Sequence, residues 1–135
     1  MGTEEKGRSR FGCVPPAVRA LRGATTLDAD TTEQMEERVQ ALLEEMLERN
    51  GVHHDDIISI VFTATDDLHA MFPATAARVL GLGDLPLLCA RELNIEGATP
   101  RCVRILMHVT TERVPADLRH VYLHGAKGLN DELRT

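Results

Sequence analysis

Residues 86–107, PLLCARELNIEGATPRCVRILM, contain two short apolar segments joined by a turn-forming segment with one glycine. From residue 103 to residue 109 the pattern is that of a β-strand, so successive side chains are expected on opposite faces of a sheet. A guanidinium beside such a strand is tolerated only when another group pairs with it. We therefore expect Arg104 to project into a site, while the alternate residues face the core. The core set is Val103, Ile105, Met107 and Val109, and Arg104 shares its face with Cys102, Leu106 and His108.

The composition narrows the class of protein. A chain of 135 residues fits one domain with a core that needs no disulfides. Fifteen basic and 21 acidic residues give a net charge of -6, which argues against a nucleic acid or an anionic membrane surface as partner. Aromatic residues, at 3%, are too few for base-stacking surfaces.

The three cysteines, at positions 13, 89 and 102, have no CxxC spacing and are odd in number. They predict neither a disulfide framework nor a zinc site, and they fit a reducing cytoplasm. The polar start lacks the apolar segment of a signal peptide, and no apolar run reaches the roughly 20 residues of a membrane span. A cytoplasmic location is therefore expected.

The order of elements predicts one α+β domain. Residues 1–16 are expected to be a flexible N-terminal extension, and residues 17–135 the domain, with a loose tail from about residue 125. The clearest element is a helix from Thr31 to Asn50, with Thr31 and Gln34 as a capping box, one apolar stripe, and Gly51 at its end. The other predicted elements are a strand at 18–22 closed by a turn at 23–26, a strand at 57–64 buried on both faces, a short helix from Pro73, and strands at 86–92, 103–109 and 119–124.

These elements describe a mixed sheet with helices on one side. The helices are too few to cover both faces of the sheet, and an uncovered apolar face calls for self-association.

Pattern alone assigns structural roles to several polar residues. They are Arg19 and Arg22 as solvated strand residues, His53, His54 and His69 as surface or capping residues without metal-ligand spacing, Asp66 and Asp67 as loop formers, and Tyr122 as a packing residue.

Several ordered motifs together resemble a known family. They are RGATT at 22–26, ATDDLHAMFPA at 64–74, Arg78, PLLCARE at 86–92, CVR at 102–104 and RHVYL at 119–123. The chain from about residue 18 to residue 129 is similar to the AroH class of monofunctional chorismate mutases. The resemblance implies a homotrimer with a pseudo-α/β-barrel fold of the bacillus type, which Rid proteins share, and active sites at the subunit interfaces.

The resemblance also implies the reaction, an intramolecular rearrangement of chorismate to prephenate in aromatic amino acid biosynthesis. No nucleophile, general base, metal or cofactor is needed. Catalysis would come from holding the compact conformer of the dicarboxylate and from stabilising the negative charge that grows on the ether oxygen. Arginines suit both tasks because they stay protonated and grip carboxylates through two parallel hydrogen bonds.

Residue by residue, the resemblance implies that Arg104 and Glu92 are catalytic. Arg104 would reach the ether oxygen and a carboxylate, and Glu92 would accept a hydrogen bond from the ring hydroxyl and orient Arg104. Arg22 and Tyr122 would bind carboxylates, and Cys89 would line the same part of the pocket as Glu92. The further substrate-binding residues would be Phe72, Ala74 and Arg78, from a neighbouring subunit, and Leu129.

Two positions depart from the family pattern. Thr75 stands where a lysine often occurs at the pocket mouth, and Asn130 where a tail arginine often occurs. We therefore expect weaker binding of chorismate with the chemical step largely kept, and equal affinity in Asn130→Arg and the parent would contradict this. The alternative function is that of a Rid-type trimer, which binds carboxylates or hydrolyses imines in intersubunit clefts.

Overall fold

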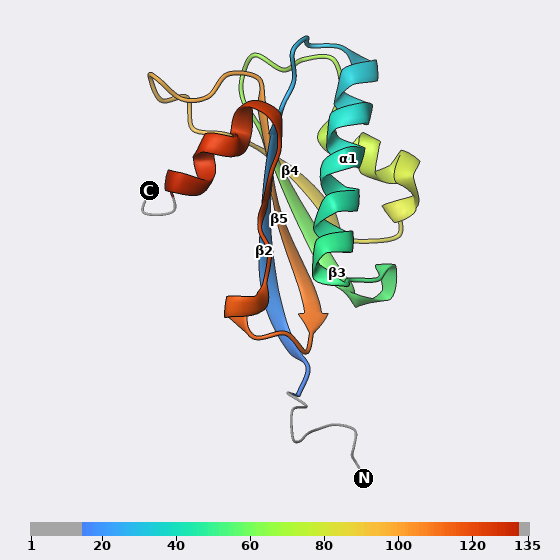
Figure 1. Ribbon diagram of the computed structural model, residues 1–135. Coiled ribbons are helices and arrows are strands. Elements are labelled where there is room, and N and C mark those ends of the chain that lie inside the picture. The colour runs from blue at the N-terminus through green and yellow to red at the C-terminus, as the bar shows by residue number, and fades with distance from the viewer. Residues whose placement is uncertain (1–14, 133–135) are drawn as a thin grey trace.

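The computed structural model describes residues 15–132, which form one five-stranded mixed sheet with helices packed against it (Figure 1). The strand order is β4-β3-β5-β2-β6. β5 is antiparallel to both of its neighbours, whereas the edge strands β4 and β6 pair in parallel with β3 and β2. The strands are β2 (Ala17–Thr26), β3 (Ile57–Ala64), β4 (Leu87–Arg91), β5 (Cys102–Thr111) and β6 (Val121–Tyr122). The helical elements are α1 (Thr32–Asn50), η1 (His54–Asp56), α2 (Pro73–Ala77), η2 (Arg78–Leu82), η3 (Pro115–Asp117) and η4 (His124–Glu132).

Helix α1 confirms the predicted helix. The Thr31 hydroxyl accepts a hydrogen bond from Gln34 N at 3.1 Å, and Gly51 closes the helix with a φ of 61°. The Gln34 side chain does not complete a capping box, because its Oε1 accepts hydrogen bonds from the backbone N–H groups of Asp28 and Ala29 instead. The apolar stripe packs on the sheet, with Met35, Val39, Leu42, Leu43 and Met46 all buried.

Strand β2 is longer than predicted, since it runs through the expected turn as far as Thr26, opposite Cys102 of β5. The glycine that suggested a turn serves close packing instead. A Cβ at Gly23 would lie 2.5 Å from Met46 Sδ and 3.2 Å from Leu42 Cδ1. Gly23 therefore lets α1 approach the strand, and the ladder with β5 keeps the backbone extended.

The two faces of the sheet differ. One face packs under α1 and α2 and holds the core, and its alternation along β5 is as predicted. The other face is open in a single chain and carries Val18, Arg22, Ser59, Val61, Thr63, Leu88, Arg104 and Leu106, which are exposed or half-buried. β3 is therefore buried on one face only, contrary to the prediction, because none of the elements within residues 15–132 covers Val61 and Thr63 fully.

The end of the chain also differs from the prediction. The part of the expected loose tail that the structure describes forms the 3₁₀ helix η4, drawn in red in Figure 1 on the side of β2 away from α1. Gly125 N donates to Thr26 Oγ1 at 2.9 Å, and Ala126 is fully buried. Helices therefore do not all lie on one side of the sheet. The extension predicted at 1–16 lies almost wholly outside the described residues.

Within residues 15–132, no helix is long and apolar enough to cross a membrane.

Candidate active site

One row of side chains crosses the open face of the sheet. The strand registers align Ala90 with Thr63, Thr63 with Arg104, Arg104 with Ala24, and Ala24 with Tyr122. Residues in register project from the same face, so this row gathers one residue from each of the five strands. Ala24, between Arg104 and Tyr122, is buried, and its small side chain leaves space between them.

Arg104 lies at the centre of the row and pairs with an acid. Its Nε is 3.4 Å from Glu92 Oε2, and the two side chains are 49% and 21% exposed. The Thr63 hydroxyl donates to the same Oε2, and Glu92 N donates to Ala64 O at 3.0 Å, which continues the ladder beyond β4. Glu92 is therefore fixed at both its backbone and its carboxylate. About half of the Arg104 side chain is exposed, and Arg104 lines the open space beside this pair.

That open space is a hollow of about 400 Å³. Arg22 lies on β2 two residues before Ala24 and so on the same face of the sheet. The Tyr122 hydroxyl is buried and has no hydrogen-bond partner among the described residues, which is the arrangement expected of a group that waits for a polar ligand. The hollow is lined by Arg22, Gly23, Ala24, Val61, Thr63, Glu92, Arg104, Ile105, Leu106, Tyr122 and Leu129.

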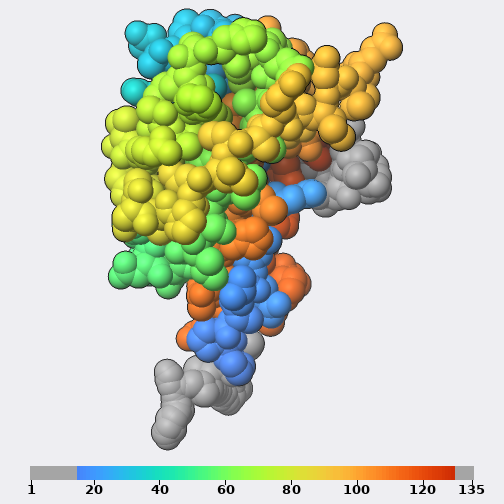
Figure 2. Space-filling model, turned by 180° about the vertical axis from the view of Figure 1, so that it is seen from behind, coloured from blue at the N-terminus to red at the C-terminus, as the bar shows by residue number. Residues whose placement is uncertain are grey.

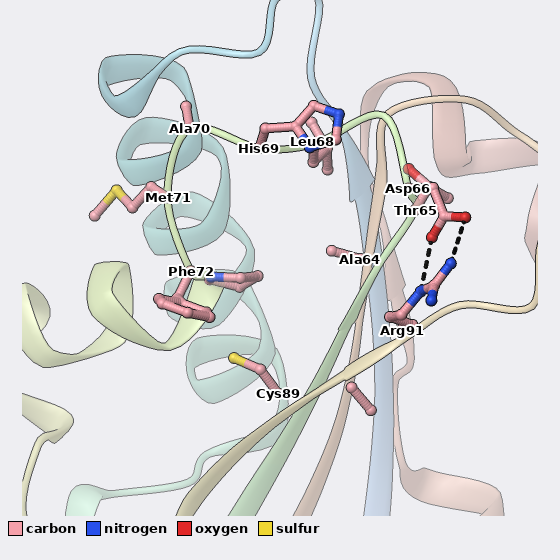
Figure 3. A pocket seen from close by; sticks show the side chains of 12 residues that line it. Ala64, Thr65, Asp66, Leu68, His69, Ala70, Met71, Phe72, Cys89 and Arg91 are labelled. Atoms are coloured by element: carbon pink, nitrogen blue, oxygen red, sulfur yellow. Dashed lines mark hydrogen bonds and ion pairs between the residues drawn. The ribbon is translucent and has the colours of Figure 1, made fainter.

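A second hollow, of about 650 Å³, lies beside β4 and the segment before α2 (Figure 3). Phe72 and Cys89 line it together with Met71. At its other side Arg91 donates to both carboxylate oxygens of Asp66, at 3.1 and 2.8 Å. The hydrogen bond from Arg91 lowers the pKa of Asp66, so this acid stays ionised.

Cys89 therefore does not share a hollow with Glu92 in one chain, contrary to the expectation. The physical reason is the alternation of the strand, because two residues three positions apart point to opposite faces. Cys89 instead points toward the same space as Phe72, as Figure 3 shows.

The other residues expected from a neighbouring subunit lie near this second hollow or in the core. Phe72 is 71% exposed, and Arg78 is exposed after α2. Ala74, however, is only 4% exposed and belongs to the core, so its methyl group has little surface for a ligand. Pro73 begins α2, as predicted, and so fixes where Phe72 leaves the backbone.

Carboxylate groups hold the loop between β3 and α2, which lines the second hollow. Asp30, from the segment before α1, accepts the N–H groups of His69 and Ala70 at 3.0 Å. Asp67 accepts the Arg101 N–H at 2.9 Å and the Thr65 hydroxyl at 2.5 Å. Burial raises the pKa of Asp67, but these hydrogen bonds outweigh it and the net shift is downward. The predicted loop-forming role of Asp66 and Asp67 is confirmed.

Among the residues that the structure describes, no three His, Cys, Asp or Glu side chains are grouped so that they could hold a metal ion. Cys102 is buried, and burial raises the pKa of its thiol, so it is not a reactive thiolate.

The sequence did not reveal the part played by two residues, one in the Arg104 hollow and one beside it. Thr63 lines the hollow and its hydroxyl donates a hydrogen bond to Glu92, whereas the sequence predicted only a strand residue. His120 does not line the hollow, but its Nδ1 accepts a hydrogen bond from the Arg22 N–H at 3.0 Å. Both contacts join residues 29 and 98 positions apart, so only strand order could have revealed them.

Comparison with known proteins gives one consistent answer. The family model described as chorismate mutase type I matches residues 18–133. The chain is 40% identical to "Chorismate mutase AroH" of Thermus thermophilus over 119 residues, which cover 87% of this chain and 98% of that relative. It is also 40% identical to "Chorismate mutase AroH" of Bacillus subtilis (strain 168) over 118 residues, covering 86% and 92%.

A solved structure agrees with these relatives. A chorismate mutase from Clostridium thermocellum superimposes with a TM-score of 0.79 at 48% identity, and the match covers 81% of this chain and 97% of that one. The Rid-type alternative is not favoured by these matches. The chain belongs to the AroH class of type I chorismate mutases, the isomerases that convert chorismate to prephenate.

Proposed function

We propose that chorismate binds in the hollow around Arg104, and that a second copy of the chain closes this hollow in a homotrimer. The observation that carries the proposal is a pair of polar groups, the Arg104 guanidinium and the Tyr122 hydroxyl, that line one hollow. Arg104 has half of its side chain exposed beside Glu92, and the buried Tyr122 hydroxyl has no partner among the described residues. A dianion would satisfy both groups.

The chemistry follows from the charges. In chorismate the bond between the ring and the enolpyruvyl oxygen breaks as a carbon-carbon bond forms within the same molecule, and negative charge grows on that oxygen. Arg104 supplies a fixed cation for this charge. Glu92 holds the guanidinium in place and accepts a hydrogen bond from the hydroxyl group on the substrate ring. Arg22 and Tyr122 bind carboxylates and so select the compact conformer.

The second hollow supplies the opposite wall. Phe72 and Cys89 line it, Arg78 lies exposed nearby, and Ala74 acts by supporting α2 rather than by contact. Because the two hollows are different surfaces of one chain, joining them requires a head-to-tail contact between copies. Such a contact is repeated by each subunit and gives a ring when the rotation closes.

The open face of the sheet supports such a contact. Leu88 is 62% exposed on this face, and Leu106 and Val18 are also exposed there. An apolar sheet face of this kind is costly in water and marks an interface. A ring of three chains buries it at the centre of the trimer. The mass in solution should be three times the 14.9 kDa of one chain.

Subunit complementation tests the shared site. Arg104→Ala removes the cationic hollow, and Cys89→Trp fills the second hollow. Each variant alone should be nearly inactive, but trimers refolded from an equal mixture should regain about a quarter of the parent activity, because each half of a site comes from an intact copy half the time. No recovery, with both variants trimeric by light scattering, would contradict a site shared between subunits.

Arg104→Ala alone tests the reaction site. Loss of chorismate absorbance should slow by about 10²–10³-fold or more in kcat, as for other preorganised transition-state donors. Arg49→Ala is the matched control, since Arg49 is a surface arginine that pairs with Glu45 on the same helix. Equal rates for Arg104→Ala and the parent would exclude this hollow as the active site.

We also propose the cytoplasm as the compartment. Cys89 and Cys102 are both free thiols, which fits a reducing environment. Mass spectrometry of protein isolated from cells under alkylating conditions should find both thiols unoxidised.

A further inference from the structure

The contact between β2 and β6 changes character at Arg22. The two strands pair in parallel from Gly23 opposite Val121 to Ala24 opposite Tyr122. One residue earlier, the Arg22 N–H is bound by a side chain instead of a carbonyl, because it donates to His120 Nδ1 at 3.0 Å. Nδ1 must therefore be unprotonated, and a neutral ring carries its proton on Nε2.

The segment that carries His120 is itself anchored to the end of α1. The buried Asn50 side chain binds both backbone polar groups of Arg119. Its Oδ1 accepts a hydrogen bond from Arg119 N at 2.7 Å, and its Nδ2 donates one to Arg119 O at 2.8 Å. The same Nδ2 also donates to Met46 O at 2.8 Å. The backbone next to His120 is therefore fixed to the core. Because the imidazole binds the Arg22 N–H, the position of β2 at Arg22 is fixed as well.

We propose that His120 is a positioning residue for Arg22, holding through its Nδ1 the backbone amide from which the Arg22 side chain enters the hollow. β6 is only two residues long, so few backbone hydrogen bonds secure this edge of the sheet. The proposal rests on the role of Arg22 in carboxylate binding given above. It predicts an effect on KM more than on kcat, because Arg104 and Glu92 lie on β5 and directly after β4, and not at the β2–β6 edge that His120 holds.

Protonation of His120 removes the acceptor. Arg22 on β2 is the charged group that acts on the ring, and Asn50, which holds the backbone of the preceding Arg119, is uncharged. Desolvation, and then the charge of Arg22, lower the pKa of His120 below its usual value of 6.5. The ring is therefore neutral at pH 7, and as the pH falls through the lowered pKa it gains a like charge and loses the hydrogen bond.

Two substitutions distinguish the role of the hydrogen-bond acceptor from that of the imidazole ring. His120→Asn keeps an acceptor, Oδ1, at the position of Nδ1 and does not titrate. His120→Gln moves its oxygen to the position of Nε2, beyond reach of the Arg22 N–H. We expect His120→Gln to raise KM for chorismate about fivefold, the usual effect of one lost hydrogen bond, and His120→Asn to stay near the parent at pH 7.5.

The pH profile gives a readout that packing alone would not move. Between pH 7.5 and pH 5, KM should rise in the parent and stay level in His120→Asn, while any titration of the substrate would appear in both. A level parent profile, or equal KM values for both variants and the parent, would overturn the proposal. Arg22→Ala distinguishes the causes: if it leaves KM unchanged, the role proposed for Arg22 fails first.

Discussion

Thr63→Val is a direct test of how Glu92 is held. Valine has nearly the shape of threonine, but it lacks the hydroxyl that donates to Glu92 Oε2. The substitution therefore leaves the strand intact and frees one oxygen of the carboxylate that pairs with Arg104 at 3.4 Å.

The magnitude follows from the type of bond and its exposure. A hydrogen bond to a charged group contributes about 1.5–3 kcal/mol. Because the Glu92 side chain is 21% exposed, water can replace part of the lost bond, and we take the lower end, about 1.5 kcal/mol. That corresponds to roughly a tenfold fall in kcat, since 1.36 kcal/mol is a factor of ten.

The assay is the loss of chorismate absorbance, with kcat and KM determined separately. KM should change little, because Glu92 is expected to act on Arg104 and the ring hydroxyl and not on the carboxylates. Thr63→Ser keeps the hydroxyl and should stay close to the parent. Equal kcat for Thr63→Val and the parent, or equal losses in the valine and serine variants, would refute this account of Glu92.

Four further predictions concern the fold and its thiols. Gly23→Ala should lower the free energy of unfolding by about 1–3 kcal/mol through overpacking against Met46, measured by urea denaturation. Thr31→Ala should cost about 1 kcal/mol by loss of the helix cap, and Thr31→Ser should restore it. In native protein, iodoacetamide should modify Cys89 well before the buried Cys102. The raised pKa of Cys102 should make stability decline as the pH rises above 9.0, and Cys102→Ala should lack that decline.

The elements that sequence predicted well are those set by local patterns. Helix α1 has its cap, stripe and terminal glycine within one segment, and the alternation of β5 placed Arg104 on the open face. The central acid-arginine pair was predicted through family resemblance, and the structure brings Glu92 and Arg104 together.

The elements that were predicted wrongly depend on distant partners. Gly23 looked like a turn because its neighbour Met46 lies on another element. The segment after Tyr122 looked loose because Gly125 binds Thr26, 99 residues earlier. The separation of Cys89 from Glu92 within one chain has a local cause instead, because strand alternation puts the two residues on opposite faces of the sheet. That Cys89 lines the complete pocket stays a prediction.

The row of residues across the sheet has a consequence for specificity. Arg104 and Tyr122 are separated by two strand spacings, about 9–10 Å, with Ala24 between them. This width is set by backbone hydrogen bonding, which side-chain substitutions do not alter. A variant that accepts a bulkier or smaller dicarboxylate should therefore arise from changes in side-chain length on this row, or from Ala24 itself, and not from insertions in the surrounding loops.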